Sequence, residues 1–157
     1  MGEVKYCLDS SALIQGWNAL YPPASFPGLW TRIAALVAAG EIVSSDEVKR
    51  EIEAKDDLLL AWCKPRTPMF VPLSGDIQAV ATQILATLPK LVDSRTGKSM
   101  ADPFVVATAK VTNTILVTQE RPTGKAERPK IPEACDLTGV AWVSLLDVIK
   151  AEGWVFS

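Results

Sequence analysis

Short apolar runs alternate with longer amphipathic segments along this chain of 157 residues. The apolar runs are rich in Val, Ile and aromatic residues, as buried parallel strands usually are, and they cover residues 4–8, 41–44, 69–72, 115–118 and 140–143. Helical periodicity marks residues 29–39, 46–53, 56–63, 75–90, 101–112 and 144–151. The alternation predicts an α/β fold, a three-layer α/β/α sandwich around a parallel sheet of about five strands.

Length and composition favour one domain spanning residues 1–157, because no internal repeat, low-complexity tract or linker interrupts the pattern. No apolar run approaches the roughly 20 residues of a membrane span, and the start M-G-E-V-K-Y lacks the features of a signal peptide. The three cysteines, Cys7, Cys63 and Cys135, are far apart, which indicates reduced thiols. We therefore expect a cytoplasmic protein with no membrane partner.

Histidine is absent from the chain. This absence excludes Ser-His-Asp and Cys-His catalysis, histidine-ligated zinc centres and imidazole acid–base chemistry. Carboxylates, hydroxyls and lysines are left to carry any chemistry.

Acidic residues follow the predicted strands. Asp9 ends V-K-Y-C-L-D, Glu47 and Glu51 lie in the helix after the second strand, Asp102 opens D-P-F-V-V-A-T-A-K, and Glu120 ends T-I-L-V-T-Q-E. Ligands of open α/β sheets bind at the carboxyl ends of the strands, so these carboxylates are expected to crowd together, with the first strand central. Crowded carboxylates repel unless a cation neutralises them, and oxygen ligands suit Mg²⁺ or Mn²⁺. The pattern predicts a divalent-metal site.

Structural explanations compete with this interpretation. Asp9 can be the N-cap of the next helix, Asp102 precedes a proline and can also be a cap, and Glu120 can be a solvated loop charge.

The second strand is followed by two glutamates in one helix. Ser44 and Glu47 match a capping box, and Glu51 lies one turn further on. One glutamate can cap the helix while the other faces the strand ends, and spacing alone does not decide which.

Four ordered motifs resemble those of PIN-domain ribonucleases, in particular the toxins of VapBC-type toxin–antitoxin pairs. They are L-D-S-S-A-L-I, S-D-E-V-K-R-E-I, M-A-D-P-F-V-V-A-T-A-K and L-V-T-Q-E, within Val4 to Val143. The resemblance implies a PIN-like fold and selects Glu51 over Glu47. It implies a list of metal-binding, catalytic acids: Asp9, Glu51, Asp102 and Glu120. It also implies that the hydroxyls of Ser10 and Thr118 hold the acidic cluster.

Two departures from the family pattern affect the site. Ser10 and Ser11 stand where Thr and Asn are common, which retains hydroxyls. Glu120 stands where Asp is usual, so its carboxylate reaches one methylene further. Because Mg²⁺ demands near-octahedral geometry, the longer arm is expected to bind through water or to favour Mn²⁺.

The implied function is a Mg²⁺- or Mn²⁺-dependent endoribonuclease that hydrolyses RNA phosphodiester bonds. The resemblance further implies a toxin restrained by an antitoxin protein, and we expect a homodimer. One alternative is a non-catalytic PIN-like module that binds RNA or protein. Another is a phosphotransfer domain with Asp9 as nucleophile, which is disfavoured because position 11 is Ser rather than a second Asp.

Basic residues flank the third and fourth acids and are expected to grip RNA phosphates, although solvated loop charges are an alternative. They are Arg95, Lys98, Arg121, Lys125, Arg128 and Lys130. The last four lie in a long proline-rich loop predicted over Arg121–Pro132. S-R-T-G-K-S lacks the first glycine of a phosphate-binding loop and is rejected as one. The aromatic, proline-rich segment W-N-A-L-Y-P-P-A-S-F-P could form an apolar partner surface.

Overall fold

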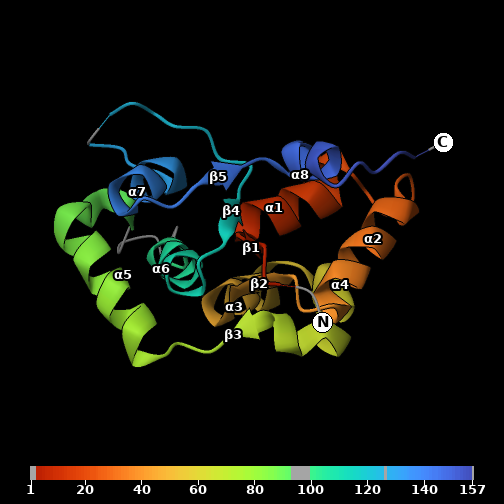
Figure 1. Cartoon of the computed structure of the whole chain (residues 1–157), viewed down its shortest axis with the longest axis horizontal. Coiled ribbons are helices and arrows are strands. Elements are labelled where there is room, and N and C mark those ends of the chain that lie inside the picture. The colour runs from red at the N-terminus through yellow and green to blue at the C-terminus, as the bar shows by residue number, and fades with distance from the viewer. Residues whose placement is uncertain (1–2, 93–99, 126, 157) are drawn as a thin grey trace.

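The computed structural model describes residues 3–92, 100–125 and 127–156. Its sheet has five strands within these residues, in the order β3-β2-β1-β4-β5, and every pairing is parallel (Figure 1). The strands are β1 (Tyr6–Leu8), β2 (Ile42–Ser45), β3 (Phe70–Val71), β4 (Ile115–Val117) and β5 (Trp142–Val143). The predicted parallel sheet with a central first strand is confirmed.

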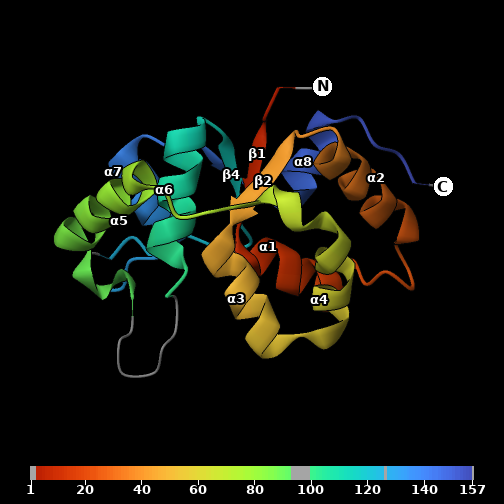
Figure 2. The same ribbon diagram turned by 90° about the horizontal axis from the view of Figure 1, so that it is seen from below.

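Helices cover both faces of the sheet, which confirms the three-layer α/β/α prediction. In the described residues they are α1 (Ser10–Gln15), α2 (Pro27–Ala38), α3 (Asp46–Lys55), α4 (Asp57–Cys63), α5 (Gly75–Thr87), α6 (Asp102–Thr112), α7 (Ile131–Thr138) and α8 (Leu145–Ala151). A π-helical turn η1 (Gly16–Leu20) and 3-10 turns η2 (Lys64–Met69) and η3 (Pro89–Leu91) complete the set. Helices α5, α6 and α7 lie on one face, and α2 and α8 lie on the other (Figures 1 and 2).

The core explains why the strands are apolar throughout. Tyr6, Cys7 and Leu8 of β1 are all buried, as expected for a central strand covered on both faces. Small residues line the buried side of α6, where Ala107 and Ala109 are fully buried and let the helix approach the sheet and α5 closely. Helix α6 also packs on β1, where the Cys7 thiol donates to the Val105 carbonyl at 3.8 Å.

One predicted helix was too long and another helix was missed. The helix expected over residues 75–90 ends at Thr87, because Leu88 precedes Pro89 and a residue before proline is disfavoured in helical conformation. Helix α7 was missed because its prolines were interpreted as loop. Proline is tolerated in the first turn of a helix, and Glu133 accepts the Lys130 N–H at 2.8 Å as a capping residue.

Candidate functional site

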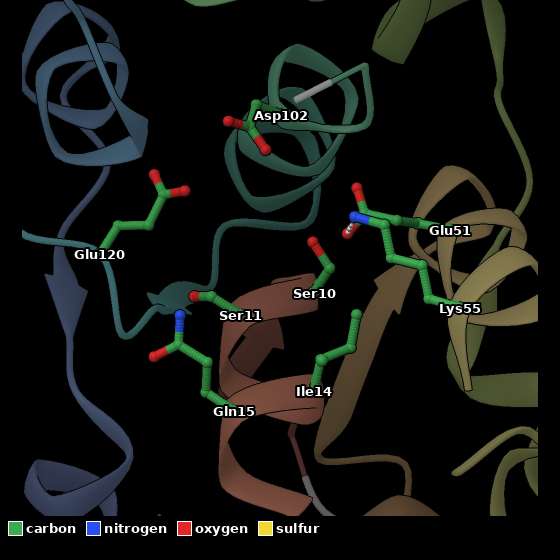
Figure 3. A pocket seen from close by; sticks show the side chains of 8 residues that line it. All are labelled: Ser10, Ser11, Ile14, Gln15, Glu51, Lys55, Asp102 and Glu120. Atoms are coloured by element: carbon green, nitrogen blue, oxygen red, sulfur yellow. Dashed lines mark ion pairs between the residues drawn. The ribbon is translucent and has the colours of Figure 1, made fainter. Parts of the chain in front are cut away.

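A cavity of about 280 Å³ opens at the carboxyl ends of the strands (Figure 3). Helix α1 forms its floor, the end of α3 one wall, the start of α6 another, and the segment after β4 the fourth side. Its lining residues are Ser10, Ser11, Ile14, Gln15, Glu51, Lys55, Asp102 and Glu120. Three of the four predicted acids thus face one cavity, although they come from elements far apart in the sequence.

Asp9, the remaining predicted acid, is buried at the end of β1, with 1% of its surface exposed. It is the N-cap of α1, and its Oδ1 accepts the Ala12 N–H at 2.7 Å. Thr118 donates to Oδ2 at 2.6 Å, and the Ser11 hydroxyl lies 2.8 and 2.9 Å from Oδ1 and Oδ2. The capping explanation is therefore correct for Asp9, whose two oxygens are both held by donors of this chain.

The environment of Asp9 favours its protonated form. Burial raises the pKa of its carboxyl to about 7, and the charge of Glu120 acts in the same direction. Hydrogen bonds from Thr118, Ala12 and Ser11 oppose that rise in pKa because they stabilise the carboxylate. A cation in the adjacent cavity would favour the ionised form.

Two hydroxyls connect Asp9 to the segment after β4. The Ser11 Oγ accepts the Gln119 N–H at 2.9 Å, and the Thr118 Oγ1 accepts the Glu120 N–H at 3.0 Å. Each hydroxyl therefore accepts a hydrogen bond from a backbone N–H and can donate a hydrogen bond to Asp9. Sequence reasoning selected Thr118, as the structure has it, but missed Ser11. Ser10, the hydroxyl implied by the resemblance, lines the cavity instead.

Glu120 contacts the start of α7. Its Oε1 accepts the Ile131 N–H at 3.0 Å, and helix N-termini favour negative charge. Glu120 is therefore fixed by a hydrogen bond rather than being only a solvated loop charge, while its side chain still lines the cavity.

The two glutamates of α3 have different surroundings. Glu51 lines the cavity, and its Oε2 lies 3.9 Å from the Lys55 Nζ. Glu47 does not line the cavity, and its Oε1 lies 3.2 Å from the Arg50 Nη1. This placement agrees with the choice of Glu51 that the resemblance implied.

The predicted capping box of α3 was wrong in detail. The N-cap is Ser45, whose Oγ accepts the Glu47 N–H at 3.2 Å. Ser44 is the last-but-one residue of β2, and its hydroxyl donates to the Leu8 carbonyl at 2.6 Å. Strand β2 extends one residue beyond the predicted end at residue 44, so the N-cap is Ser45 and not Ser44. The Ser44 hydroxyl instead joins β2 to β1.

Asp102 is the first residue of α6 and is 4% exposed. It is not the N-cap, since Ala101 holds that position without a side-chain cap. In Figure 3 its carboxylate lies on the cavity side of the first turn, across from Ser10. The favourable field at the start of a helix acts on this carboxylate as well.

Among the described residues that line the cavity, carboxylates and hydroxyls supply most of the side-chain polar atoms, and Lys55 and Gln15 supply the nitrogens. Within the described part of the chain, no group of three or more Asp, Glu or Cys side chains is gathered closely enough to hold a metal ion. The carboxylates surround the cavity without forming a complete coordination shell.

The predicted RNA-binding cations that the structure describes do not line the cavity. Arg121, Lys125, Arg128 and Lys130 are exposed on the segment between Glu120 and α7, and Arg95 and Lys98 lie outside the described residues. Lys55, which sequence reasoning did not select, does line it. The sequence feature that could have identified Lys55 is its i,i+4 spacing from Glu51 in the same helix.

The aromatic segment 17–27 begins with Trp17, which packs against the core. The Trp17 ring packs on Trp30 and Trp62, with centroids 5.0 and 6.1 Å apart. Tyr21 packs edge-on against Phe26 at 5.4 Å, and Phe26 and Leu20 remain partly exposed. Phe26 and Pro27 line a surface hollow together with the exposed Val155 and Phe156, so an apolar surface exists here but continues onto the last described residues.

Two comparisons with known proteins and one property of the helices bear on identity. Among the described residues, no helix combines the length and apolar character that crossing a membrane requires. The search of curated proteins gave no match. The profile of a family described as "Domain of unknown function (DUF4411)" matches residues 6–156, nearly the whole chain. The chain therefore belongs to the DUF4411 family.

Proposed function

We propose that this protein is a Mg²⁺- or Mn²⁺-dependent endoribonuclease of the PIN type. One observation carries the proposal: Glu51, Asp102 and Glu120 line a single cavity at the carboxyl ends of parallel strands, next to the buried Asp9, whose chain neighbours Ser10 and Ser11 line the same cavity. Acids delivered from separate elements to the ligand-binding edge of such a sheet are what a divalent-cation site needs.

The residues present fit such a cation in their chemistry. The facing carboxylates are hard oxygen ligands, and no histidine or cysteine lines the cavity to favour zinc instead. Burial holds the pKa of Asp9 at about 7, which leaves a carboxyl whose ionised form a bound cation would favour. Glu51 and Asp102 would hold the cation directly and Glu120 would hold it through water, with Asp9 buried beside them.

The protein's own residues would position these ligands. Ser11 and Thr118 orient Asp9 through hydrogen bonds, and the Ile131 N–H orients Glu120. When bound, a divalent cation would polarise a phosphodiester oxygen and lower the pKa of water. Because the chain has no histidine, carboxylates and solvent are left to accept protons.

The wider biological part of the proposal comes from the PIN resemblance. A ribonuclease of this kind is proposed to be a cytoplasmic toxin that an antitoxin protein restrains, and to act as a homodimer. The cavity volume of about 280 Å³ leaves room for a phosphate group of the RNA backbone and a cation.

A non-catalytic binding module is the second candidate. It is favoured by the lack, among the described residues, of three acidic side chains close enough to share a metal ion. It would need only the cavity and the surrounding cations. Metal titration separates the two candidates, because a scaffold would show no binding that depends on Asp102.

The test is cleavage of a panel of RNAs in Mn²⁺, Mg²⁺ or EDTA by the wild type and by Asp102→Asn. The expected result is cleavage that requires Mn²⁺ or Mg²⁺ and is lost in the variant. The amide keeps the size of the side chain while removing its charge. Cleavage that persists in EDTA, or wild-type activity in the variant, would refute the proposal.

A further inference from the structure

We infer that Lys55 is the phosphate-binding residue of this cavity and takes a non-bridging oxygen of a single-stranded RNA backbone. The inference rests on the proposed function for its substrate. Among the described residues that line the cavity, Lys55 is the one cation, and it shares this lining with Glu51, Asp102 and Glu120. Three carboxylates repel an approaching polyanion, and a cation of the protein at the cavity mouth would offset this repulsion by binding a phosphate.

The ion pair of Lys55 is loose enough to exchange. Its Nζ lies 3.9 Å from the Glu51 Oε2, at the limit of a salt bridge, and 58% of the Lys55 side chain is exposed. Surface pairs of this kind contribute little to stability, since solvent screens them and the long side chain must be held in place. In Figure 3 the ammonium group lies beside Glu51 at the edge of the cavity. An arriving phosphate can therefore replace the carboxylate as its partner.

The backbone beneath Lys55 is firmly placed. The next residue, Asp56, donates its N–H to the Ile52 carbonyl at 2.9 Å and caps α4 by accepting the Leu59 N–H at 3.0 Å. Asp56 also accepts a hydrogen bond of 2.6 Å from Asn18 of η1. The corner between α3 and α4 is thus tied to the turn after α1. A fixed Cα with a flexible, exposed arm suits a residue that must find a phosphate on a mobile strand.

The same helix provides a matched control. Arg50 pairs with Glu47 as Lys55 pairs with Glu51, and both glutamate side chains are 19% exposed. The Arg50 side chain is 69% exposed, so it is as available to solvent as Lys55, but it does not line the cavity. Removing either cation changes the net charge of the protein equally. Any difference in RNA affinity between the two variants is therefore due to the position of the removed cation and not to the change in net charge.

The experiment measures binding of a fluorescein-labelled single-stranded RNA by anisotropy in EDTA, where cleavage is blocked. The proteins are the wild type, Lys55→Met, Lys55→Arg and Arg50→Met, each checked by thermal unfolding. We expect Lys55→Met to weaken binding about tenfold and to reduce the slope of log affinity against log salt by about 0.7, the value for one phosphate contact on a single strand. Lys55→Arg should restore most of the affinity, and Arg50→Met should behave as wild type.

Steady-state cleavage in Mn²⁺ separates this inference from the proposed function. A higher KM for Lys55→Met with a smaller change in kcat supports a contact made to the bound substrate. Unchanged RNA affinity, salt slope and KM in Lys55→Met, with an active wild type, overturns the inference alone. A wild type that binds RNA through Lys55 but never cleaves it overturns the hydrolase function alone. A wild type that neither binds RNA nor cleaves it in Mn²⁺ overturns both.

Discussion

Thr118 donates a hydrogen bond of 2.6 Å to Asp9, although 109 residues separate the two in sequence. The bond joins the ends of two neighbouring parallel strands, β1 and β4. Because Thr118 also accepts the Glu120 N–H at 3.0 Å, one hydroxyl orients Asp9 and places the backbone of Glu120. This relationship ties the buried acid to the cavity above it.

Replacing Thr118 with Val should destabilise the protein more at pH 8 than at pH 5. The Thr118 hydrogen bond lowers the pKa of Asp9, so it stabilises the carboxylate, which predominates at pH 8. Losing a buried partner of a charged group costs about 1–3 kcal/mol. Urea unfolding at both pH values checks this. Thr82→Val, which removes a hydroxyl from the exposed side of α5, is the control, and equal losses at the two pH values would contradict the prediction.

The stability of the metal-free protein should fall as pH rises. The pKa of Asp9 is 3.8 in an exposed reference and about 7 in the fold, so between these values the folded state binds more protons than the unfolded state. The stabilisation is complete below about pH 4 and is lost as pH rises through about 7. Denaturant midpoints from pH 4 to 8 measure it.

The matching variant is Asp9→Asn, which should flatten this pH dependence because it no longer titrates. Asp147→Asn is the control, since hydrogen bonds from Ser144 lower the pKa of that exposed carboxyl and its titration lies at acid pH. If Asp9→Asn kept the full wild-type slope between pH 4 and 7, another group would have to be responsible.

Glu51→Gln should abolish RNA cleavage while Glu47→Gln leaves it intact. Glu51 lines the cavity, whereas Glu47 pairs with Arg50 outside it. Loss of a direct ligand is expected to exceed the roughly 10- to 100-fold effects of outer partners. Initial rates in Mn²⁺ measure the change. The assignment of the two glutamates is reversed if Glu47→Gln is the inactive variant.

Glu120→Gln should be more tolerant than Asp102→Asn. The amide oxygen of Gln can still accept the Ile131 N–H, so the side chain keeps its position and loses only its charge. A loss of about 10- to 100-fold, as for an outer partner of a metal site, is expected. Cleavage rates against Mn²⁺ concentration compare the two variants. An equal, complete loss in both would make Glu120 a direct ligand.

The basic segment before α7 should strengthen RNA binding from outside the cavity. Glu133 holds this segment by accepting the N–H groups of Thr123 and Lys130 at 3.0 and 2.8 Å, so its exposed cations have a defined base. Replacing its cations with Ala should weaken RNA binding and flatten the salt dependence by about 0.7 per lost contact, with metal affinity unchanged. The triple variant carries Arg121→Ala, Lys125→Ala and Arg128→Ala.

The control for this variant removes the same charge elsewhere, from exposed positions on α2, η2 and α8. Those positions are Arg32, Lys64 and Lys150. Anisotropy at several salt concentrations compares the two proteins. Wild-type affinity and slope in the loop variant, or equal effects in both, would remove the segment from the binding surface.

Local patterns in the sequence determined the architecture. Alternating apolar and amphipathic runs predict a parallel sheet between helices, and an acid that must meet others on both sides places the first strand in the centre, as the sheet order confirms. These local patterns led to a wrong prediction where one sequence feature is compatible with two structures. Pro132 indicates a loop or the first turn of a helix equally well, and only the capping by Glu133 shows which one the chain adopts.

Tertiary structure decided which side chains meet. The sequence brought Asp9, Glu51, Asp102 and Glu120 forward as candidates, because strand ends are recognisable from the chain alone. Pairing of Ser11 with Asp9, the contact of Glu120 with α7 and the presence of Lys55 at the cavity depend on distances across elements. Sequence spacing records the face of a helix on which a residue lies, but the partner that this face meets is set by the packing of the other layers.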